Sequence, residues 1–351
     1  MKKVKIAILG LNQGYKFAVD AMTMPDVELV AVAGFGEQAE ERARELGVQL
    51  FNDYKDLIHN CHVDGIIITL PNELHLDAVK LCAAKGIHVL VEKPIASTIE
   101  DGQEIIEQCK KHNVELLVGH HRRFSSKVRR LKEVIDSGVL GDIVGVNMLC
   151  TLAKNHDYFS EPWRLEKGGG PLLINGIHEV DTLRYITGSE IKSVYAVTNN
   201  RIRGNKVEDT ASVTFEMDQG ILVNYFISDG TPSPWAYDLN AWEIAKYTQF
   251  NGDCYQVFGT KGSVTFPSMK LYRYEQEELG WLSHIKEEHL YITDNDPARE
   301  ELVHFSAILR QEEKPYVTGE DALETLKVIS AIKRSAEEKQ NIIMDKQMVT
   351  K

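Results

Sequence analysis

Val4-Lys-Ile-Ala-Ile-Leu9, followed at once by Gly10-Leu-Asn-Gln-Gly14, is the stretch of sequence that decides the fold. Its first part is apolar toward both faces of a strand, which is typical of a strand inside a parallel sheet. The glycine turn leads into a helix-like run from Phe17. Such a turn presents backbone N–H groups and the positive end of a helix to a pyrophosphate. The stretch therefore predicts the first strand and the phosphate loop of a dinucleotide-binding fold.

The alternation of short apolar strands with amphipathic helices continues to about residue 120. β-Branched runs predict further strands, at 27–32, 65–69, 88–91 and 115–118. Helical patterns that are apolar at i, i+3 and i+4 lie between them, at 39–46, 73–84 and 99–112. Strands of this kind that alternate with helices indicate a doubly wound parallel sheet covered on both sides.

The rhythm changes after residue 121. A helix at 127–137 leads into strand-like segments, predicted at 143–149, 194–199, 210–216, 221–227, 255–259 and 264–266. Helices are predicted at 173–186, 299–311 and 320–339. Turn signals between several strands favour hairpins. We therefore predict an α/β Rossmann domain over 1–121 and an α+β domain over 122–351. The second domain is expected to have an open, mostly antiparallel sheet, and its last helix to pack back toward the first domain.

Composition narrows the class of protein. The chain of 351 residues has 52 acidic and 40 basic residues and a net charge of -12, which argues against nucleic acid as a partner. We expect no membrane span, because no apolar run approaches the required length of about 18 residues. No metal-ligand spacing is present among the histidines and cysteines, so no metal is expected. The expected location is the cytoplasm.

The glycine motif itself is incomplete. In the pattern G-x-G-x-x-G, the second and third glycines would fall on Asn12 and Tyr15, and Gly14 is displaced by one place. The second strand should end in an acid that binds the adenosine ribose, but here it runs into Gly34. The choice between NAD and NADP therefore stays open. From this region we assign four loop residues and the strand end to the cofactor: Gly10, Asn12, Gln13, Gly14 and Gly34.

Two later strand ends carry polar residues. Thr69-Leu-Pro71-Asn72-Glu-Leu-His75 follows the strand at 65–69, and Glu92-Lys93-Pro94 follows the strand at 88–91. Ligands bind at the carboxyl ends of strands in open parallel sheets. We therefore add six residues to the predicted cofactor site: Thr69, Pro71, Asn72, His75, Glu92 and Lys93.

With these motifs the chain resembles the Gfo/Idh/MocA family of NAD(P)-dependent oxidoreductases, which includes glucose–fructose oxidoreductase and inositol dehydrogenase. The resemblance runs nearly end to end. It includes the two strand-end motifs, Gly119-His-His-Arg-Arg-Phe124, Ser137-Gly-Val-Leu-Gly141, Trp163-Arg164, Gly168-Gly-Gly170, Asn175-Gly-Ile-His178-Glu-Val-Asp181 and Glu208-Asp209-Thr-Ala211. It implies that Lys93 and His178 line the substrate pocket beside the nicotinamide.

One departure concerns the helix that carries His178. The family usually has an aspartate four residues before the histidine, and that position is Ile174 here. Asn175 would project about 100° away from Ile174 on a regular helix, so it replaces the aspartate only if the helix shifts. We assign Lys93, His178 and Asn175 as catalytic.

A neutral imidazole can take the proton of an alcohol, and an ammonium group favours the developing alkoxide. Which of His178 and Lys93 is the base stays open, because burial can lower the pKa of a lysine. Further cofactor contacts are assigned to Arg122, Trp163 and Arg164. Substrate contacts are assigned to Lys93, His121, Tyr158, Arg164, Asn175 and His178.

The predicted activity is hydride transfer between NAD or NADP and a secondary alcohol or ketone of a sugar, inositol or other cyclic polyol. Two alternatives stay open. One is a dihydrodiol dehydrogenase that acts on a carboxylated ring, and the other is a non-catalytic sensor or partner protein that keeps the fold. The open sheet and the family resemblance predict a homo-oligomer, a dimer or tetramer formed through the C-terminal domain.

Overall fold

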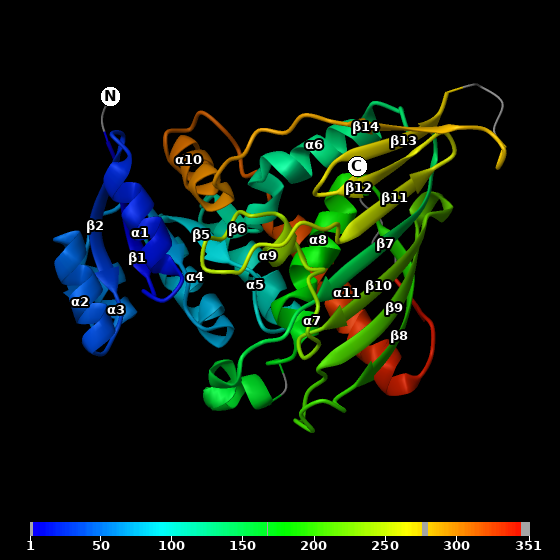
Figure 1. The fold of residues 1–351 in the computed structure, drawn as a ribbon. Helices are drawn as coiled ribbons and strands as arrows, with labels where there is room; N and C mark the ends of the chain where they lie inside the picture. Colours follow the sequence, from blue (N-terminus) through cyan, green and yellow to red (C-terminus); the bar gives the residue numbers. More distant parts are fainter. Residues whose placement is uncertain (1–2, 167, 276–279, 345–351) are drawn as a thin grey trace. The chain divides into compact units, whose positions relative to one another are not determined.

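The computed structural model describes residues 3–166, 168–275 and 280–344, which fall into two units (Figure 1). The first unit runs from Met1 to Phe124 and takes in Asp296–Leu326 as well. The second consists of Ser125–Asn295 and Lys327–Lys351. The first unit therefore draws on two separate stretches of the chain.

A six-stranded parallel sheet forms the centre of the first unit, in the order β3-β2-β1-β4-β5-β6. Its strands are β1 (Val4–Leu9), β2 (Val27–Ala33), β3 (Gln49–Phe51), β4 (Gly65–Ile68), β5 (His88–Glu92) and β6 (Leu116–Gly119). The chain runs outward from β1 in one direction and then returns to add β4 on the other side. The carboxyl ends of β1 and β4 are thus the switch point of the sheet, where this fold binds its ligands.

The helices of the first unit alternate with its strands. They are α1 (Gly14–Thr23), α2 (Glu37–Leu46), α3 (Tyr54–Asn60), α4 (His75–Ala84), α5 (Ile99–Lys111) and α10 (Pro297–Leu309), with the first part of α11 (Gly319–Glu338). The predicted doubly wound fold is confirmed. The sequence patterns missed β3 and α3, because a strand of three residues and a helix of seven are too short to show a clear period.

The second unit is built on a nine-stranded, mostly antiparallel sheet, in the order β14-β13-β12-β11-β7-β10-β9-β8-β15. Its strands are β7 (Ile143–Thr151), β8 (Ile191–Asn199), β9 (Thr210–Met217), β10 (Leu222–Ser228), β11 (Tyr255–Gly259), β12 (Ser263–Phe266), β13 (Lys270–Tyr274), β14 (Ile285–His289) and β15 (Ile342–Ile343). Among the pairs formed by these strands, β7 with β10 is parallel. The predicted α+β class is confirmed, and β13, β14 and β15 extend the predicted sheet.

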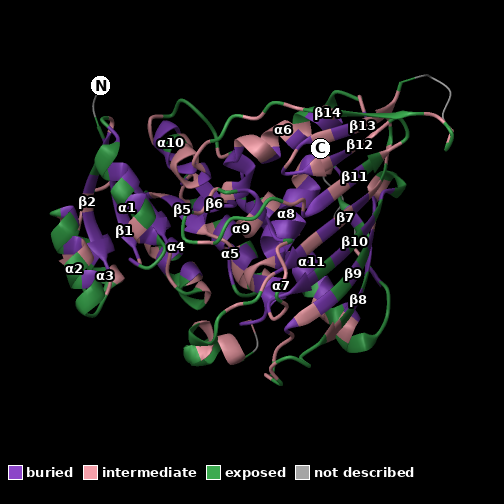
Figure 2. Cartoon of the chain, viewed as in Figure 1, coloured by how far each residue is buried: buried purple, intermediate pink, exposed green. Residues whose placement is uncertain are grey.

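Only one face of this second sheet is buried in the chain. Along β10 the exposed Leu222, Asn224 and Phe226 alternate with the buried Val223, Tyr225 and Ile227. Helices α6 (Ser126–Asp136), α8 (Gly176–Thr187) and the last part of α11 belong to the same unit (Figure 2). The Oγ of Ser335 on α11 accepts a hydrogen bond of 2.9 Å from the backbone of Ala196 on β8. The helices therefore cover one face, and the other is exposed.

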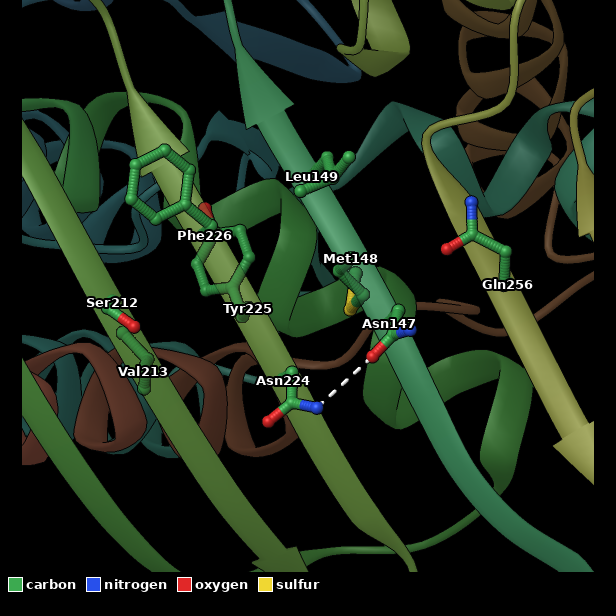
Figure 3. A pocket seen from close by; sticks show the side chains of 9 residues that line it. All are labelled: Asn147, Met148, Leu149, Ser212, Val213, Asn224, Tyr225, Phe226 and Gln256. Carbon is green, nitrogen blue, oxygen red and sulfur yellow. Dashed lines mark hydrogen bonds between the residues drawn. The ribbon is translucent and has the colours of Figure 1, made fainter.

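Figure 3 shows a pocket on the sheet of the second unit. Strands β7, β9, β10 and β11 supply its lining: Asn147, Met148, Leu149, Ser212, Val213, Asn224, Tyr225, Phe226 and Gln256. The amide of Asn224 donates a hydrogen bond of 3.2 Å to Asn147 across the strands. The lining is mixed in polarity.

The close packing of α1 onto the sheet predicts the effect of a side chain at Gly14. A Cβ there would lie 2.6 Å from the Cγ2 of Ile8 and 2.7 Å from the Oγ1 of Thr69. Gly14→Ala should therefore lower the free energy of unfolding by about 1–3 kcal/mol, measured by urea denaturation. Gly280→Ala is the matched control, because its Cβ would meet nothing closer than 3.5 Å. Equal effects of the two changes would contradict this packing.

Candidate active site

The glycine loop of the first unit is bound tightly to the end of β4. Gly10 has a φ of +90°, and a Cβ there would lie 2.6 Å from the backbone oxygen of Thr69. The hydroxyl of Thr69 lies 2.7 Å from the oxygen of Gly10 and 3.0 Å from that of Leu9. The backbone of Thr69 also donates to Leu9 at 2.8 Å. Thr69 thus fixes the path of the loop.

Gly14 performs the packing role of the displaced third glycine. It begins α1, and its missing side chain lets the helix start directly against Ile8 and Thr69. Asn12 and Gln13 before it are exposed, and Gln13 forms no side-chain cap on the helix. The first N–H groups of α1 are therefore open to an anion. A glycine turn packed this closely against β1 and β4, and followed by open helix N–H groups, is the geometry that a dinucleotide pyrophosphate requires, so the residues present fit the predicted cofactor.

The end of β2 offers no carboxylate at Gly34. The next residue, Phe35, is 87% exposed, so an aromatic ring stands where the adenosine is expected. Arg42 on α2 donates a hydrogen bond to the oxygen of Leu11 in the glycine loop, and its guanidinium lies 4.8 Å from the ring centre of Tyr15. A cation that the sequence analysis did not consider therefore lies beside the loop, on a helix whose first turn carries Glu37 and Glu40.

His75 connects the two predicted strand-end motifs. It is fully buried, and its Nδ1 lies 3.1 Å from the oxygen of Pro94 while its Nε2 lies 3.0 Å from the oxygen of Leu70. Pro71 is exposed and Asn72 is half-buried, at the start of a 3-10 helix. His75 therefore contacts both strand-end motifs from the interior of the unit, and Pro71 and Asn72 lie nearer the surface.

Lys93 is half-buried and follows β5, joined to Pro94 by a cis peptide bond. The backbone N–H of Lys93 donates a hydrogen bond of 3.2 Å to the Glu92 carboxylate. Burial raises the pKa of Glu92, and the charge of Lys93 opposes that rise. Gly119 on β6 pairs with Glu92, and a Cβ at Gly119 would lie 3.3 Å from the carboxyl carbon of Glu92. The structure therefore brings an acid and an ammonium group together at this strand end.

The predicted helix at 173–186 is interrupted in the second unit. A short helix, α7 (Pro171–Ile174), ends just before Asn175, and α8 begins just after it, at Gly176. An asparagine competes with the helical backbone for hydrogen bonds, and glycine is a poor helix former. The prediction of one continuous helix was therefore wrong at this point. The expected angle of about 100° between Ile174 and Asn175 applies to a regular helix, and the helix is interrupted at Asn175.

His178 lies in the first turn of α8 and is 8% exposed. Its backbone N–H donates a hydrogen bond of 3.0 Å to the oxygen of Asn175. Within the described residues, the Oδ1 of Asn175 is buried and accepts no hydrogen bond. The neighbouring Glu179 accepts a hydrogen bond from the buried Tyr255, which anchors the helix to β11. The structure thus brings Asn175 and His178 into one turn on a firmly held element.

Aromatic rings and cations gather in the segment between β7 and α7. The ring centre of Tyr158 lies 4.6 Å from the Nζ of Lys154 and 4.0 Å from the guanidinium of Arg164. Arg164 also lies 5.2 Å from the ring of Trp163, which is 52% exposed. Such a surface offers apolar faces to the C–H bonds of a sugar and hydrogen-bond donors to its oxygens. We call Lys154, Tyr158, Trp163 and Arg164 the aromatic–cation cluster.

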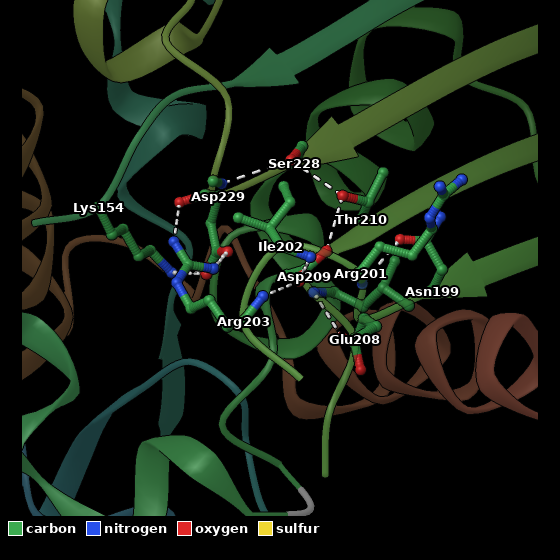
Figure 4. A network of polar contacts seen from close by, with 12 residues as sticks. Lys154, Asn199, Arg201, Ile202, Arg203, Glu208, Asp209, Thr210, Ser228 and Asp229 are labelled. Carbon is green, nitrogen blue, oxygen red and sulfur yellow. Dashed lines mark hydrogen bonds and ion pairs between the residues drawn. The ribbon is translucent and has the colours of Figure 1, made fainter. Parts of the chain in front are cut away.

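A polar network binds Lys154 of this cluster (Figure 4). Asp229 is 3% exposed and binds both Lys154, at 3.2 Å, and Arg203. The guanidinium of Arg203 lies 4.1 Å from the ring centre of Phe159, the neighbour of Tyr158. The buried Asp209 accepts hydrogen bonds from the backbone of Ile202 at 2.9 Å and of Arg203 at 3.0 Å. Sequence reasoning missed Lys154 and Asp229, because they lie 75 residues apart and carry no local motif.

The two remaining predicted residues follow β6 in the first unit. Arg122 is 2% exposed, and His121 is half-buried, in the 3-10 helix His121–Phe124. Their assignments stay predictions.

Over the described residues, no cluster of three or more potential ligands could hold a metal. No described helix is both long enough and apolar enough to cross a membrane.

Two family models match the chain. The model "Oxidoreductase family, NAD-binding Rossmann fold" matches residues 4–120, and "GFO/IDH/MocA C-terminal domain" matches residues 128–265. The myo-inositol 2-dehydrogenase of Thermotoga maritima is 27% identical over 97% of this chain and 99% of its own length. The 2,7-anhydro-N-acetylneuraminate hydratase of Mediterraneibacter gnavus is 31% identical over 75% of this chain and 67% of its own length. A solved structure of a probable dehydrogenase from Thermotoga maritima has a TM-score of 0.76 at 25% identity, covering 97% of this chain and 98% of that one.

The burial of His75 predicts a dependence of stability on pH. Burial lowers the pKa of this histidine below its usual value of 6.5, so the unfolded chain binds the proton more readily. The contribution of neutral His75 to stability is therefore present above about pH 6.5 and is lost as the pH falls through the folded-state pKa. His75→Gln should reduce the loss of stability between pH 7.5 and 5.5, by up to about 1.4 kcal/mol per pH unit below 6.5. Urea unfolding at both pH values measures this, and an unchanged slope would contradict it.

Proposed function

From the premise that the chain belongs to the Gfo/Idh/MocA family of NAD-binding oxidoreductases, we propose that it oxidises or reduces a ring carbon of an inositol, a sugar or another cyclic polyol. The observation that supports this most is the E-K-P strand end with Lys93, in a chain that aligns over 97% of its length with a myo-inositol 2-dehydrogenase. The aromatic–cation cluster supports a substrate with C–H faces and several oxygens.

The first unit supplies the cofactor site in this proposal. The loop from Gly10 to Gly14 and the N-terminus of α1 would hold the pyrophosphate, and Thr69, Pro71 and Asn72 would border the path toward Lys93. When bound, the nicotinamide accepts or donates the hydride. Gly34 and Arg42 together leave room for a ribose with or without a 2′-phosphate, so either NAD or NADP is accommodated.

The chain's own residues handle the proton of the substrate oxygen. We assign Lys93 the role of stabilising the alkoxide, because an ammonium group close to a developing negative charge lowers the barrier. We assign His178 the transfer of the proton, because a neutral imidazole has a pKa near the working pH. If burial lowers the pKa of Lys93 far enough, Lys93 takes the proton and His178 stabilises the alkoxide. Asn175 orients His178 or the substrate through its unpaired Oδ1.

Substrate recognition is assigned mainly to the second unit. Tyr158 and Trp163 would lie against the ring carbons, while Arg164 and His121 would bind hydroxyl or carboxylate oxygens. Because Asp229 binds Lys154 and Arg203 from the protein side, these cations are held in place before the substrate arrives. Such preorganisation reduces the entropy lost on binding.

We further propose that the chain forms a homo-oligomer through the exposed face of the nine-stranded sheet, and that it works in the cytoplasm. The exposed face carries large apolar side chains in several strands, with Leu222 of β10 60% exposed and Val197 of β8 54% exposed. Apolar side chains gathered on one face favour burial against a second copy.

The relative named as a hydratase favours a second candidate function, the addition of water to an anhydro sugar. That reaction has no net oxidation. An anhydro sugar would then be converted with no accumulation of reduced cofactor, whereas a dehydrogenase reduces one cofactor for each alcohol oxidised. The stoichiometry of the two products distinguishes the candidates.

The assignment of Lys93 and His178 predicts the kinetics of their variants. Lys93→Ala and His178→Ala should each lower kcat roughly a hundredfold or more, with little change in cofactor affinity, in assays with myo-inositol and related polyols. Because both groups act on one oxygen, the double variant should lose less than the product of the two losses. Asn175→Ala should cost less. A Lys93→Ala enzyme within about twofold of the wild type would remove Lys93 from the mechanism.

Because the end of β2 has no carboxylate at Gly34, introducing one there should change the preference between NADH and NADPH. Gly34→Asp would place a carboxylate where the ribose hydroxyls bind and should shift the ratio of affinities toward NADH and away from NADPH. A Cβ at this position would lie 3.1 Å from that of Ala39, which a small movement of α2 accommodates. Gly34→Asn provides the uncharged control. A preference that moves toward NADPH, or not at all, would contradict the placement of the adenosine.

A further inference from the structure

Three glycines, Gly168, Gly169 and Gly170, precede α7, and each lacks a side chain for a different reason. Gly168 has a φ of +97°, a backbone conformation that favours glycine. A Cβ at Gly169 would lie 2.5 Å from the Cα of Arg164, so the two backbone segments pack directly on each other. Gly170 has a φ of -74° and a ψ of 162°, which any residue can adopt. The need for glycine at 170 therefore comes from a neighbouring group.

That group is the carboxyl of Glu208. A Cβ at Gly170 would lie 2.5 Å from the carboxyl carbon of Glu208, a separation that real Cβ atoms do not reach. The same carboxyl accepts a hydrogen bond of 3.1 Å from the backbone N–H of Leu172, in the first turn of α7. An N–H in the first turn of a helix has no partner within the helix itself. Glu208 therefore caps the start of α7, and a glycine at 170 lets it come this close.

Glu208 is held in place by the central strands of the second sheet. It lies two residues before β9, which pairs with β8 on one side and β10 on the other. The backbone of the next residue, Asp209, donates a hydrogen bond of 3.0 Å to Asn199 at the end of β8 and accepts one of 3.1 Å from Asp229 after β10 (Figure 4). Burial raises the pKa of Glu208, and hydrogen bonds from its own backbone and from Leu172 oppose that rise. A side chain withdrawn from water on a rigid strand end can fix another segment.

The start of α7 determines where Asn175 and His178 stand. The N–H of Asn175 donates a hydrogen bond of 2.9 Å to the oxygen of Pro171, and the N–H of His178 donates one of 3.0 Å to the oxygen of Asn175. Because α7 has only four residues, it contributes little stability of its own. Its position therefore depends on contacts from outside the helix, and the hydrogen bond from Leu172 to Glu208 is one of them.

We propose that Glu208 is a positioning residue, which fixes α7 and thereby the turn that carries Asn175 and His178. This rests on the proposed role of His178 in proton transfer. Glu208 acts through the backbone of α7, and Gly170 is the residue that admits its carboxyl group. The G-G-G segment and the Glu208-Asp209 motif, which are separate in the sequence, are thus the two sides of one contact.

Hydrogen exchange followed by mass spectrometry tests this contact on the full-length protein. Glu208→Ala should speed the exchange of the backbone N–H groups of residues 171–178 by about five- to tenfold, the effect of one lost hydrogen bond. Glu208→Gln keeps an acceptor oxygen at the same reach and should leave the exchange near that of the wild type. Ser335→Ala is the matched control, because it removes a buried side-chain acceptor from the backbone of Ala196, elsewhere in the same unit.

Unchanged exchange over 171–178 in Glu208→Ala, or an equal acceleration there in Ser335→Ala, would overturn the proposal. This measurement needs neither cofactor nor substrate. It therefore decides whether Glu208 holds the turn even if the proposed oxidoreductase function fails.

The consequence for the reaction is a loss of kcat without a matching change in KM. Glu208→Ala should lower kcat roughly ten- to a hundredfold, because a small displacement of the group that transfers the proton slows the chemical step. KM and the affinity for the cofactor should stay within about twofold. Glu208→Gln should retain most of kcat, and Ser335→Ala should lower stability while kcat stays. A Glu208→Ala enzyme with raised KM and unchanged kcat, or a Glu208→Gln enzyme as slow as Glu208→Ala, would overturn the proposal.

Gly170→Ala displaces the same carboxyl group without removing it, and keeps the proposal testable if Glu208→Ala does not fold. Alone, it should speed exchange over 171–178 and lower kcat. In the Glu208→Ala background the added methyl group has room, so its effect on kcat should be at least about threefold smaller. Gly65→Ala, which crowds Leu309 in the first unit, should have equal effects in both backgrounds. A Gly170→Ala variant that leaves both exchange and kcat unchanged, or that costs as much without Glu208 as with it, would overturn the proposal.

Discussion

The close approach of Thr69 to Gly10 and Gly14 is the constraint on which the rest of the first unit depends. The backbone and hydroxyl of Thr69 bind the end of β1, and neither glycine has room for a Cβ on that side. Because of this contact, α1 begins directly at the switch point of the sheet, with its first N–H groups open to an anion. The same edge then receives the E-K-P strand end, and the buried His75 packs its ring nitrogens against the oxygens of Leu70 and Pro94 there. A phosphate cradle and a lysine are thus set on one edge by backbone contacts, not by flexible side chains.

Both units pair a reactive group with a rigid support. In the first, Lys93 follows Glu92 at the end of β5, and the backbone N–H of Lys93 donates a hydrogen bond to the Glu92 carboxylate. In the second, His178 follows a break in the helix at Asn175, and the next residue, Glu179, is bound to Tyr255. The aromatic–cation cluster has its own buried anion in Asp229. Each cation or imidazole that we assign to the chemistry therefore has neighbours that fix its charge or orientation before the substrate binds.

The sequence was sufficient to predict the parallel sheet, because strands apolar toward both faces alternate with amphipathic helices over 1–121. It also placed Thr69 and Lys93 at strand ends, because the end of an apolar run locates the edge of a sheet. It could not show that Gly14 replaces the missing third glycine, since that depends on the distance to Ile8 and not on spacing. The break at Asn175 was missed because the apolar period of α8 continues through it. Lys154 and Asp229 carry no local signal at all, because they lie 75 residues apart and only folding brings them within 3.2 Å of each other.

The edge around Gly10, Gly14 and Thr69 is the place where a nicotinamide dinucleotide should bind. Titration of the purified protein with NADH and with NADPH, followed by nicotinamide fluorescence, tests it most directly. At least one of the two should bind saturably at micromolar concentration and should be displaced by ADP-ribose, which carries the same pyrophosphate without the nicotinamide. Absence of binding of both up to millimolar concentration would contradict the account and would favour a sensor or partner protein that has kept the fold without the cofactor.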